Sequence, residues 1–291
     1  MVADHAPVLV LDGPPGAGKT SLLARMVCAL GDTAVWFTEP NARLSAGLAA
    51  PVHPSPAGHT LWFLRHELDK ARAMAHLVAA PATSLLISDR NHLGALAYCY
   101  ATRAEDSLPY RTARDFYARR IAPELPETVL SAILLVSPEQ SLTRRGNVAE
   151  LPRWKQWFDE GLLERLHTFY TDIAPTLCPT PPAVINTDGV TRELVLAQVA
   201  GVLADAGFDR TARALTSAAA PAARPPLDEQ FADAYTHLGG LEAFGHPFTP
   251  AFAHRGGTVQ LCQLGALHAD AAGHTRLWNP LTDAPPVRGA A

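Results

Sequence analysis

The feature that most constrains this chain is the segment from residue 13 to residue 20, which reads Gly-Pro-Pro-Gly-Ala-Gly-Lys-Thr. It fits the pattern G-x-x-x-x-G-K-[ST] at every position. The apolar run 8–11 predicts a buried strand before it, and residues 21–27 carry apolar side chains at helical spacing after it. Strand, glycine-rich turn and helix in this order predict a cradle in which backbone N–H groups and a helix N-terminus face phosphate oxygens.

This pattern assigns a role to each residue of the loop. We expect Lys19 to reach the outer phosphates of ATP and the Thr20 hydroxyl to bind Mg²⁺. A glycine-rich turn with a chance lysine is the competing interpretation, and the flanking strand and helix disfavour it. The residues assigned to the nucleotide are Gly13, Pro14, Pro15, Gly16, Ala17, Gly18, Lys19 and Thr20.

Apolar runs continue along the chain and alternate with helical patterns. The runs are nearly continuous, which is typical of strands buried on both faces of a parallel sheet. The sequence therefore predicts an α/β fold over residues 1–207, with a doubly wound, parallel, five-stranded sheet of the P-loop type. The expected strands are 8–11, 34–38, 85–88, 132–136 and 183–186, and the expected helices are 61–79, 93–101, 111–121, 154–173 and 192–203.

The remainder of the chain differs in composition. Residues 208–226 are rich in Ala, Pro and Arg and predict a linker with a short helical piece. Residues 227–282 carry spaced aromatic side chains and Gly pairs, which predict a small module that binds a partner or packs on the domain formed by residues 1–207. Residues 283–291 are expected to form a flexible tail.

Net charge and composition disfavour nucleic acid and membrane as partners of this chain. The net charge of −4 gives no electrostatic footprint for nucleic acid, and no apolar run approaches the about 20 residues that span a bilayer. Four scattered cysteines without a C-x-x-C spacing predict reduced thiols. We expect a cytoplasmic protein whose partner is a small-molecule phosphate acceptor, with a homodimer left open.

Ligands of such folds bind at the carboxyl ends of the strands, so the residues that end each strand are candidates. Asp12 is expected to bind substrate or orient water on Mg²⁺, or else to serve only as a turn residue. Glu39 is the first candidate for the group that accepts the proton of an acceptor hydroxyl. The competing interpretation is a surface glutamate before the bend at Pro40.

The third expected strand is followed by two residues of opposite charge, Asp89 and Arg90. Asp89 is expected to hold Mg²⁺ together with Thr20 and to lie near the substrate, and Arg90 to offset charge on the transferred phosphoryl group. A local salt bridge between Asp89 and Arg90 is the alternative.

Two further pairs are candidates. Arg144 and Arg145 end a helix that begins near Pro138, and a basic flap after them would close over phosphates, unless the segment is an ordinary helix end and loop. Trp62 and Arg65 are expected to contact the acceptor, although core packing explains Trp62 equally well.

Residues 10–20, 37–40 and 88–98 resemble, in content and in order, the thymidylate kinase and deoxynucleoside kinase superfamily, including herpesvirus-type thymidine kinases. The resemblance covers about residues 7–205. It implies that Glu39 is the base for a 5′-hydroxyl, that Arg90 lies near the transferred phosphate, and that Arg144 or Arg145 is a flap arginine. The chain lacks the arginine that precedes this glutamate in thymidylate kinases, and Gly94 and Cys99 replace the family's serine and glutamine.

Together these features predict an ATP- and Mg²⁺-dependent kinase. Its acceptor would be the hydroxyl of a nucleoside or nucleoside-like compound, or a nucleoside monophosphate. Residues 60–80 contain no glutamine of the kind that reads a base in nucleoside kinases, so an antibiotic or another alcohol remains an alternative acceptor. A regulatory ATPase with a partner-binding C-terminal module is an alternative from a different class.

Overall fold

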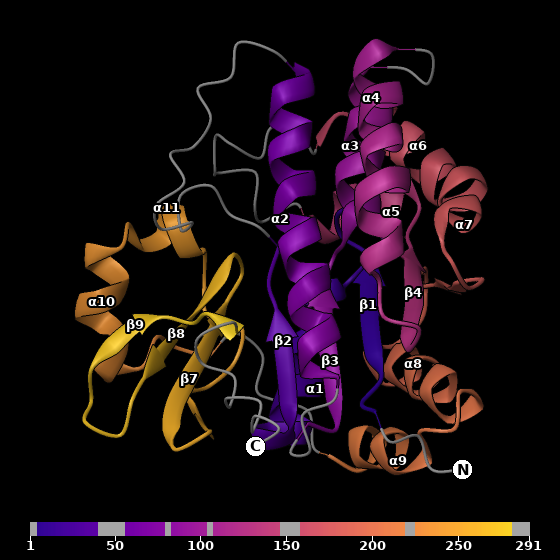
Figure 1. The fold of residues 1–291 in the computed structure, drawn as a ribbon. Helices are drawn as coiled ribbons and strands as arrows, with labels where there is room; N and C mark the ends of the chain where they lie inside the picture. Colours follow the sequence, from indigo (N-terminus) through magenta and orange to yellow (C-terminus); the bar gives the residue numbers. More distant parts are fainter. Residues whose placement is uncertain are drawn as a thin grey trace.

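The central sheet of the computed structural model, which describes residues 5–39, 56–78, 83–103, 107–145, 158–218 and 225–280, is fully parallel (Figure 1). Its five strands lie in the order β2-β3-β1-β4-β5. The predicted doubly wound α/β fold is thereby confirmed. The strands are β1 (Val8–Asp12), β2 (Ala34–Phe37), β3 (Leu85–Asp89), β4 (Val129–Leu135) and β5 (Ala183–Asn186).

Helices cover both faces of this sheet. Leu9 and Leu11 of β1 pack with α1 (Lys19–Leu30), α8 (Arg192–Asp205) and α9 (Asp209–Ser217) on one face. Val8 and Val10 point to the other face and pack on α2 (Pro56–Leu77), because successive side chains of a strand alternate. A third apolar cluster joins α2 to α3 (His92–Arg103), α4 (Leu108–Phe116), α6 (Glu160–Thr168) and α7 (Ala174–Leu177). Both faces of β1 are therefore buried, which explains the unbroken run of apolar residues in its sequence.

Local capping accounts for where several helices begin. Ser107 caps α4 and accepts from the Tyr110 N–H at 3.3 Å, and Asp159 caps α6 and accepts from the Leu162 N–H at 2.8 Å. Two expected helices end in π-helical turns, η2 (Tyr117–Ile121) and η6 (Phe169–Ile173). The expected start of the helix 154–173 lies partly outside the described residues, as do the expected flap after Arg145 and the tail 283–291.

The C-terminal segment forms a second, antiparallel sheet of four strands in sequence order. It has its own core around Phe231 and Phe244. The module comprises η7 (Glu229–Phe231), α10 (Ala232–His237), α11 (Gly240–Phe244), β6 (Phe252–His254), β7 (Gly257–Cys262), β8 (Gly265–Ala269) and β9 (Thr275–Leu277).

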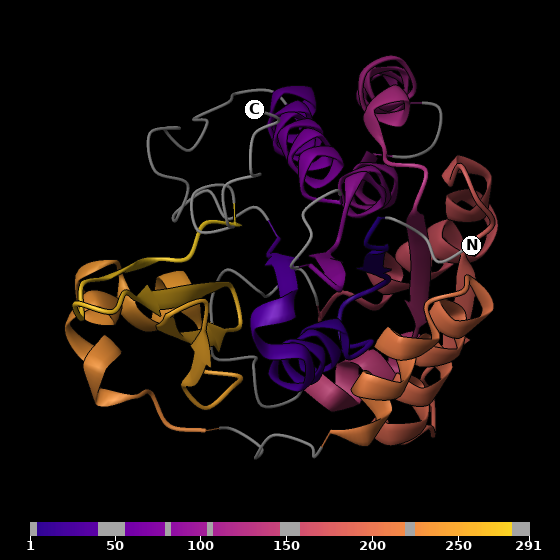
Figure 2. The same cartoon turned by 60° about the horizontal axis from the view of Figure 1, so that its bottom comes forward.

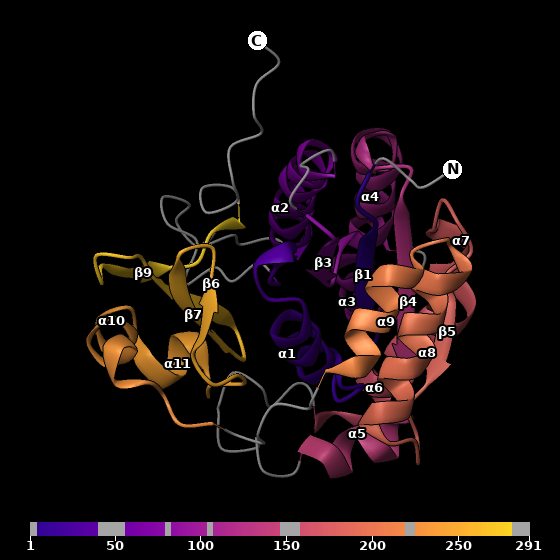
Figure 3. The same ribbon diagram turned by 90° about the horizontal axis from the view of Figure 1, so that it is seen from below.

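This module packs against β2, the edge strand opposite β5 (Figures 2 and 3). The Trp278 ring stacks on the Trp36 ring with centroids 4.7 Å apart, and its Nε1 donates to the Trp36 carbonyl at 3.4 Å. The Arg255 N–H donates to Asp32 at 2.5 Å. Val259 and Trp278 also belong to the apolar cluster that contains α1, so the two sheets share buried surface.

Within the segment expected to be a linker, α9 packs on α1 and α8 with Leu215 fully buried. Residues 219–224 of that segment lie outside the described part of the chain. Among the described residues, no helix is both long and apolar enough to cross a bilayer.

Candidate active site

The phosphate loop joins β1 to α1 as the pattern predicted. Gly13 has a φ of 136°, and a Cβ atom there would lie 2.0 Å from the Leu134 carbonyl oxygen, so no other residue fits without a shift. The loop also rests on α5 (Pro138–Arg145), where Ser141 Oγ donates to the Pro15 carbonyl at 2.7 Å. Contacts with β4 and α5 therefore hold the phosphate loop in place.

Lys19 lies folded over its own loop. Its Nζ donates to the Gly13 carbonyl at 2.8 Å and to the Pro14 carbonyl at 2.9 Å. Burial, assisted by the charge of Arg90, lowers the pKa of Lys19 to about 7. The ammonium group is thus held by two carbonyl oxygens that compete only weakly with an anion for it.

Asp12 is bound on all sides by donors of the chain itself. Its Oδ1 accepts from the Gly13 N–H at 2.7 Å and from Tyr170 Oη at 2.6 Å, and its Oδ2 accepts from the Asn91 N–H at 3.2 Å. The side chain is 1% exposed and is not among the residues that line the adjacent cavity. Its observed contacts tie the phosphate loop to β3 and η6.

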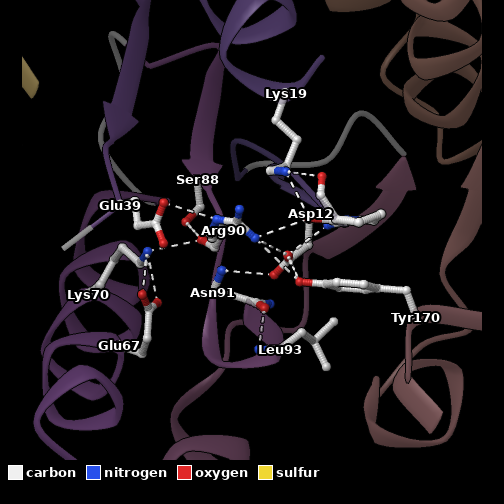
Figure 4. Close-up of polar contacts among 12 residues, drawn as sticks. Asp12, Lys19, Glu39, Glu67, Lys70, Ser88, Arg90, Asn91, Leu93 and Tyr170 are labelled. Atoms are coloured by element: carbon white, nitrogen blue, oxygen red, sulfur yellow. Dashed lines mark hydrogen bonds and ion pairs between the residues drawn. The ribbon is translucent and has the colours of Figure 1, made fainter. Parts of the chain in front are cut away.

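Arg90 lies at the centre of the site, between Glu39 on one side and Asp12 and Tyr170 on the other (Figure 4). Its Nε donates to Glu39 Oε2 at 3.0 Å and its Nη1 to the Gly13 carbonyl at 3.1 Å. Burial alone would lower the pKa of Arg90, but the Glu39 and Asp12 carboxylates raise it above its usual value. Arg90 therefore bridges the phosphate loop and Glu39, and the alternative of a local Asp89–Arg90 salt bridge is not what forms.

Asp89 and Thr20 lie at the ends of neighbouring elements. Asp89 ends β3 and is buried, and burial raises its pKa to about 6 despite the nearby Lys19. Thr20 is in the first turn of α1 and half-buried. Within the described residues, the Asp89 carboxyl makes no hydrogen bond or ion pair, and no cluster of three metal-ligating side chains occurs. A free carboxylate and a hydroxyl beside a phosphate cradle fit Mg²⁺, which takes few protein ligands and completes its shell with phosphate and water.

A cavity of about 350 Å³ opens beside Glu39 and Arg90. His59, Phe63 and Glu67 line it from one face of α2, where they follow one another at four-residue spacing. Gly94, Ala95 and Tyr98 of α3 line it as well. The lining thus combines aromatic rings on both helices, Phe63 and Tyr98, with the small residues Gly94 and Ala95, a composition that suits a flat group.

Trp62 and Arg65 do not line this cavity. Trp62 is buried and packs on Phe63 and His66, with centroids 4.8 and 4.0 Å away, and Arg65 is exposed. On α2 both residues lie away from the face shared by positions 59, 63 and 67, because the helix turns about 100° per residue. Packing describes Trp62, as the competing interpretation held, and Phe63 takes the lining position. The expected contact of Trp62 and Arg65 with an acceptor stays a prediction.

The two candidate arginines at the end of α5 differ in surroundings. Arg144 is exposed, and its Nη1 donates to the Gly16 carbonyl at 3.2 Å and to Thr187 Oγ1 at 3.0 Å. Arg145 is buried with its guanidinium 5.2 Å from the centre of the Phe158 ring, and burial together with Arg90 lowers its pKa to about 10. Arg144 thus touches the phosphate loop. The basic flap expected after Arg145 lies outside the described residues.

Sequence reasoning missed three side chains of the site. Tyr170 binds Asp12 and Arg90 from η6, and Glu67 and Lys70 form a buried ion pair on α2. Burial raises the pKa of Glu67 to about 7, and the adjacent Lys70 opposes this shift. The available signal was the i, i+3 spacing of opposite charges within an otherwise apolar helical face.

No protein-family model matches this sequence, and no curated protein sequence matches it either. Several solved structures, in contrast, resemble this chain in fold. The thymidylate kinase of Candida albicans, described as having broad substrate specificity, aligns over 70% of this chain and 93% of its own at 13% identity, with a TM-score of 0.52. The deoxyadenosine kinase of M. mycoides with bound dATP aligns over 69% of this chain and 99% of its own at 16% identity, with a TM-score of 0.49.

At such low identity, likeness establishes the fold and not the substrate. The parallel sheet, the phosphate loop at its centre and the helices on both faces agree with that likeness. The chain, in which a phosphate loop follows the first strand, therefore shares its parallel α/β fold with the thymidylate kinase of Candida albicans.

Proposed function

We propose that this protein is an ATP- and Mg²⁺-dependent phosphotransferase that phosphorylates a hydroxyl of a nucleoside or nucleoside-like acceptor. The observation that carries the proposal is the position of Arg90, which donates both to the phosphate loop at Gly13 and to Glu39 at the edge of the cavity. One cation thereby lies between the expected positions of donor and acceptor, where it can offset charge on the transferred phosphoryl group.

On the donor side, the loop N–H groups and the N-terminus of α1 bind the phosphates. Lys19 exchanges the Gly13 and Pro14 carbonyls for outer phosphate oxygens. Mg²⁺, for which Thr20 and Asp89 are the candidate ligands, neutralises charge on the phosphates when bound. The burial of Lys19 away from water strengthens its attraction to that charge.

On the acceptor side, Glu39 orients the hydroxyl and takes its proton. The acceptor oxygen forms a bond to the γ-phosphorus, and the bond from that phosphorus to the β,γ-bridging oxygen breaks, so that ADP leaves. Arg90 offsets the negative charge that develops during transfer. Glu39 is 50% exposed, which leaves its carboxylate accessible from the cavity.

The cavity wall favours an unphosphorylated acceptor. Glu39 and Glu67 both line it, and the Arg90 guanidinium is already paired with Glu39. Lys70 compensates the charge of Glu67, whereas Glu39 keeps a half-exposed carboxylate that would repel a phosphate monoester and accept hydrogen bonds from hydroxyl and N–H groups. A nucleoside should therefore be a better acceptor than its own monophosphate.

The test measures ATP consumption with a panel of nucleosides, their monophosphates and aminoglycoside alcohols. Wild-type turnover should depend on one acceptor class, and Glu39→Gln should lower kcat/KM by about 10²–10⁴-fold, the usual contribution of a general base. Glu193→Gln, which removes an exposed carboxylate paired with Arg25, is the control and should leave turnover unchanged. Hydrolysis that needs no acceptor and survives Glu39→Gln would refute the kinase and favour the regulatory ATPase.

A further inference from the structure

A buried ion pair on α2 connects the cavity wall to Arg90. Lys70 Nζ lies 3.0 Å from Glu67 Oε1 and 2.8 Å from its Oε2, and the two side chains are 7% and 4% exposed. The same Nζ donates to the Arg90 carbonyl at 3.0 Å. Glu67 itself lines the cavity. The pair therefore touches the expected acceptor position through Glu67 and the central arginine through Lys70 (Figure 4).

Arg90 needs such support because its backbone is strained. Its φ is 63°, in the left-handed region that residues with a Cβ atom avoid. The Arg90 N–H donates to the Leu11 carbonyl at 2.9 Å, and the Arg90 carbonyl accepts from Ser88 Oγ at 2.5 Å as well as from Lys70. This conformation sends the guanidinium toward Glu39 and Gly13. Loss of a donor to that carbonyl would release the backbone to a commoner conformation and move the guanidinium.

Stability alone gives a poor account of the pair. Buried ion pairs are expensive to desolvate and are commonly no more stabilising than apolar side chains of the same volume. Arg72 of the same helix forms a second ion pair, with Glu124 at 3.0 Å. Its two side chains are 46% and 40% exposed, and neither lines the cavity. Comparing the two pairs distinguishes the effect of losing an ion pair on α2 from the effect of losing the contact with Arg90.

We propose that Glu67 and Lys70 are positioning residues for Arg90. Lys70 holds the Arg90 carbonyl so that the guanidinium spans Glu39 and the phosphate loop, and Glu67 holds the Lys70 ammonium. Because Glu67 lies in the cavity wall, an acceptor that contacts it acts on the position of Arg90 through Lys70. This inference rests on the proposed function, since it assigns Arg90 the role given there.

The test compares Lys70→Met, Lys70→Arg and the double variant Glu67→Gln/Lys70→Met with wild type. A catalytic group misplaced by about 1 Å costs about 100-fold in rate, so Lys70→Met should lower kcat by about 10–100-fold while KM for ATP stays within about twofold. Lys70→Arg, which keeps a cation and donors, should recover part of kcat. The double variant leaves no unpaired buried charge, so it should melt near the wild-type temperature and still show the loss in kcat. Arg72→Met is the matched control and should keep wild-type kcat.

Crystal structures of wild type and the double variant provide a readout that needs no acceptor. The proposal expects the variant's Arg90 to leave the left-handed region and to lose its contacts with Glu39 and the Gly13 carbonyl. A folded double variant that keeps this Arg90 geometry overturns the proposal, as does one that keeps wild-type kcat. Wild-type protein that phosphorylates no acceptor refutes the proposed function instead, and the crystal structures then decide the positioning role alone.

Discussion

The pKa of Lys19 leads to a prediction about nucleotide binding. Its ammonium group is buried against the Gly13 and Pro14 carbonyls, and burial with the charge of Arg90 lowers its pKa to about 7. A bound triphosphate places negative charge beside Lys19 and raises that pKa toward and beyond its ordinary value. Binding at alkaline pH should therefore take up a proton from solution.

The size of this uptake follows from the pKa. With a pKa of about 7, Lys19 is about nine-tenths neutral at pH 8, so each nucleotide should take up about 0.9 proton there, about 0.5 at pH 7 and about 0.1 at pH 6. Phosphate groups, whose second pKa is about 6, are ionised at pH 8. Asp89, whose pKa is raised to about 6, is ionised there too. Lys19 is thus the main source of uptake at pH 8.

Titration calorimetry with a non-hydrolysable ATP analogue measures the uptake. The apparent binding enthalpy at pH 8 should vary between two buffers in proportion to the difference in their ionisation enthalpies, with a slope near 0.9 proton. Lys19→Arg is the control, because a guanidinium stays protonated and should take up none. Equal enthalpies in both buffers for wild type, or an unchanged slope in Lys19→Arg, would refute the reasoning.

Three further predictions concern stability. Gly13→Ala should lower the free energy of unfolding, measured by chemical denaturation, by about 2–4 kcal/mol, because its Cβ would lie 2.0 Å from the Leu134 carbonyl oxygen and its backbone would be strained. Gly18→Ala has the backbone strain but meets no atom within 4 Å, so it should cost only about 1–2 kcal/mol. Trp278→Ala should lower the free energy of unfolding by about 3–5 kcal/mol, because the ring is buried against Trp36, and the half-exposed Leu241→Ala control should change it by less than about 0.5 kcal/mol. Burial, with Lys70 nearby, lowers the pKa of His92 to about 3, below its unfolded value, so stability is present above about pH 6.5 and falls as the pH drops. His92→Phe should remove about 1.4 kcal/mol of the loss between pH 7.5 and pH 5.5.

The sequence predicted the parts of this molecule that depend on local signals. Strands β1, β2 and β3 were recognisable because both of their faces are buried, and the loop pattern located the phosphate cradle. Glu39, Asp89 and Arg90 were selected because parallel strands deliver their carboxyl ends to one edge of the sheet. The structure brings these three side chains into one electrostatic network with Lys19.

The parts that could not be predicted depend on the rotation of a helix about its axis and on contacts between residues far apart in the sequence. Trp62 and Phe63 are adjacent in sequence, and only the phase of α2 decides which of them faces the cavity. Arg90 pairs with Glu39, 51 residues away, and not with its neighbour Asp89, because the left-handed backbone at Arg90 redirects its side chain. The contact of Trp36 with Trp278 spans 242 residues and has no local signature.

The contacts of Arg90 couple the two halves of the site. Its Nη1 rests on the Gly13 carbonyl and its Nε on Glu39, so a cation drawn toward donor phosphates must loosen its pairing with that carboxylate. Glu39 can then accept a hydrogen bond from the acceptor hydroxyl in place of the one it receives from Arg90 Nε. A bound donor nucleotide should thus make Glu39 available to an acceptor hydroxyl, and an acceptor that binds Glu39 should in return release Arg90 to the phosphates. Since coupling between two binding equilibria is reciprocal, each ligand must strengthen the binding of the other by the same factor.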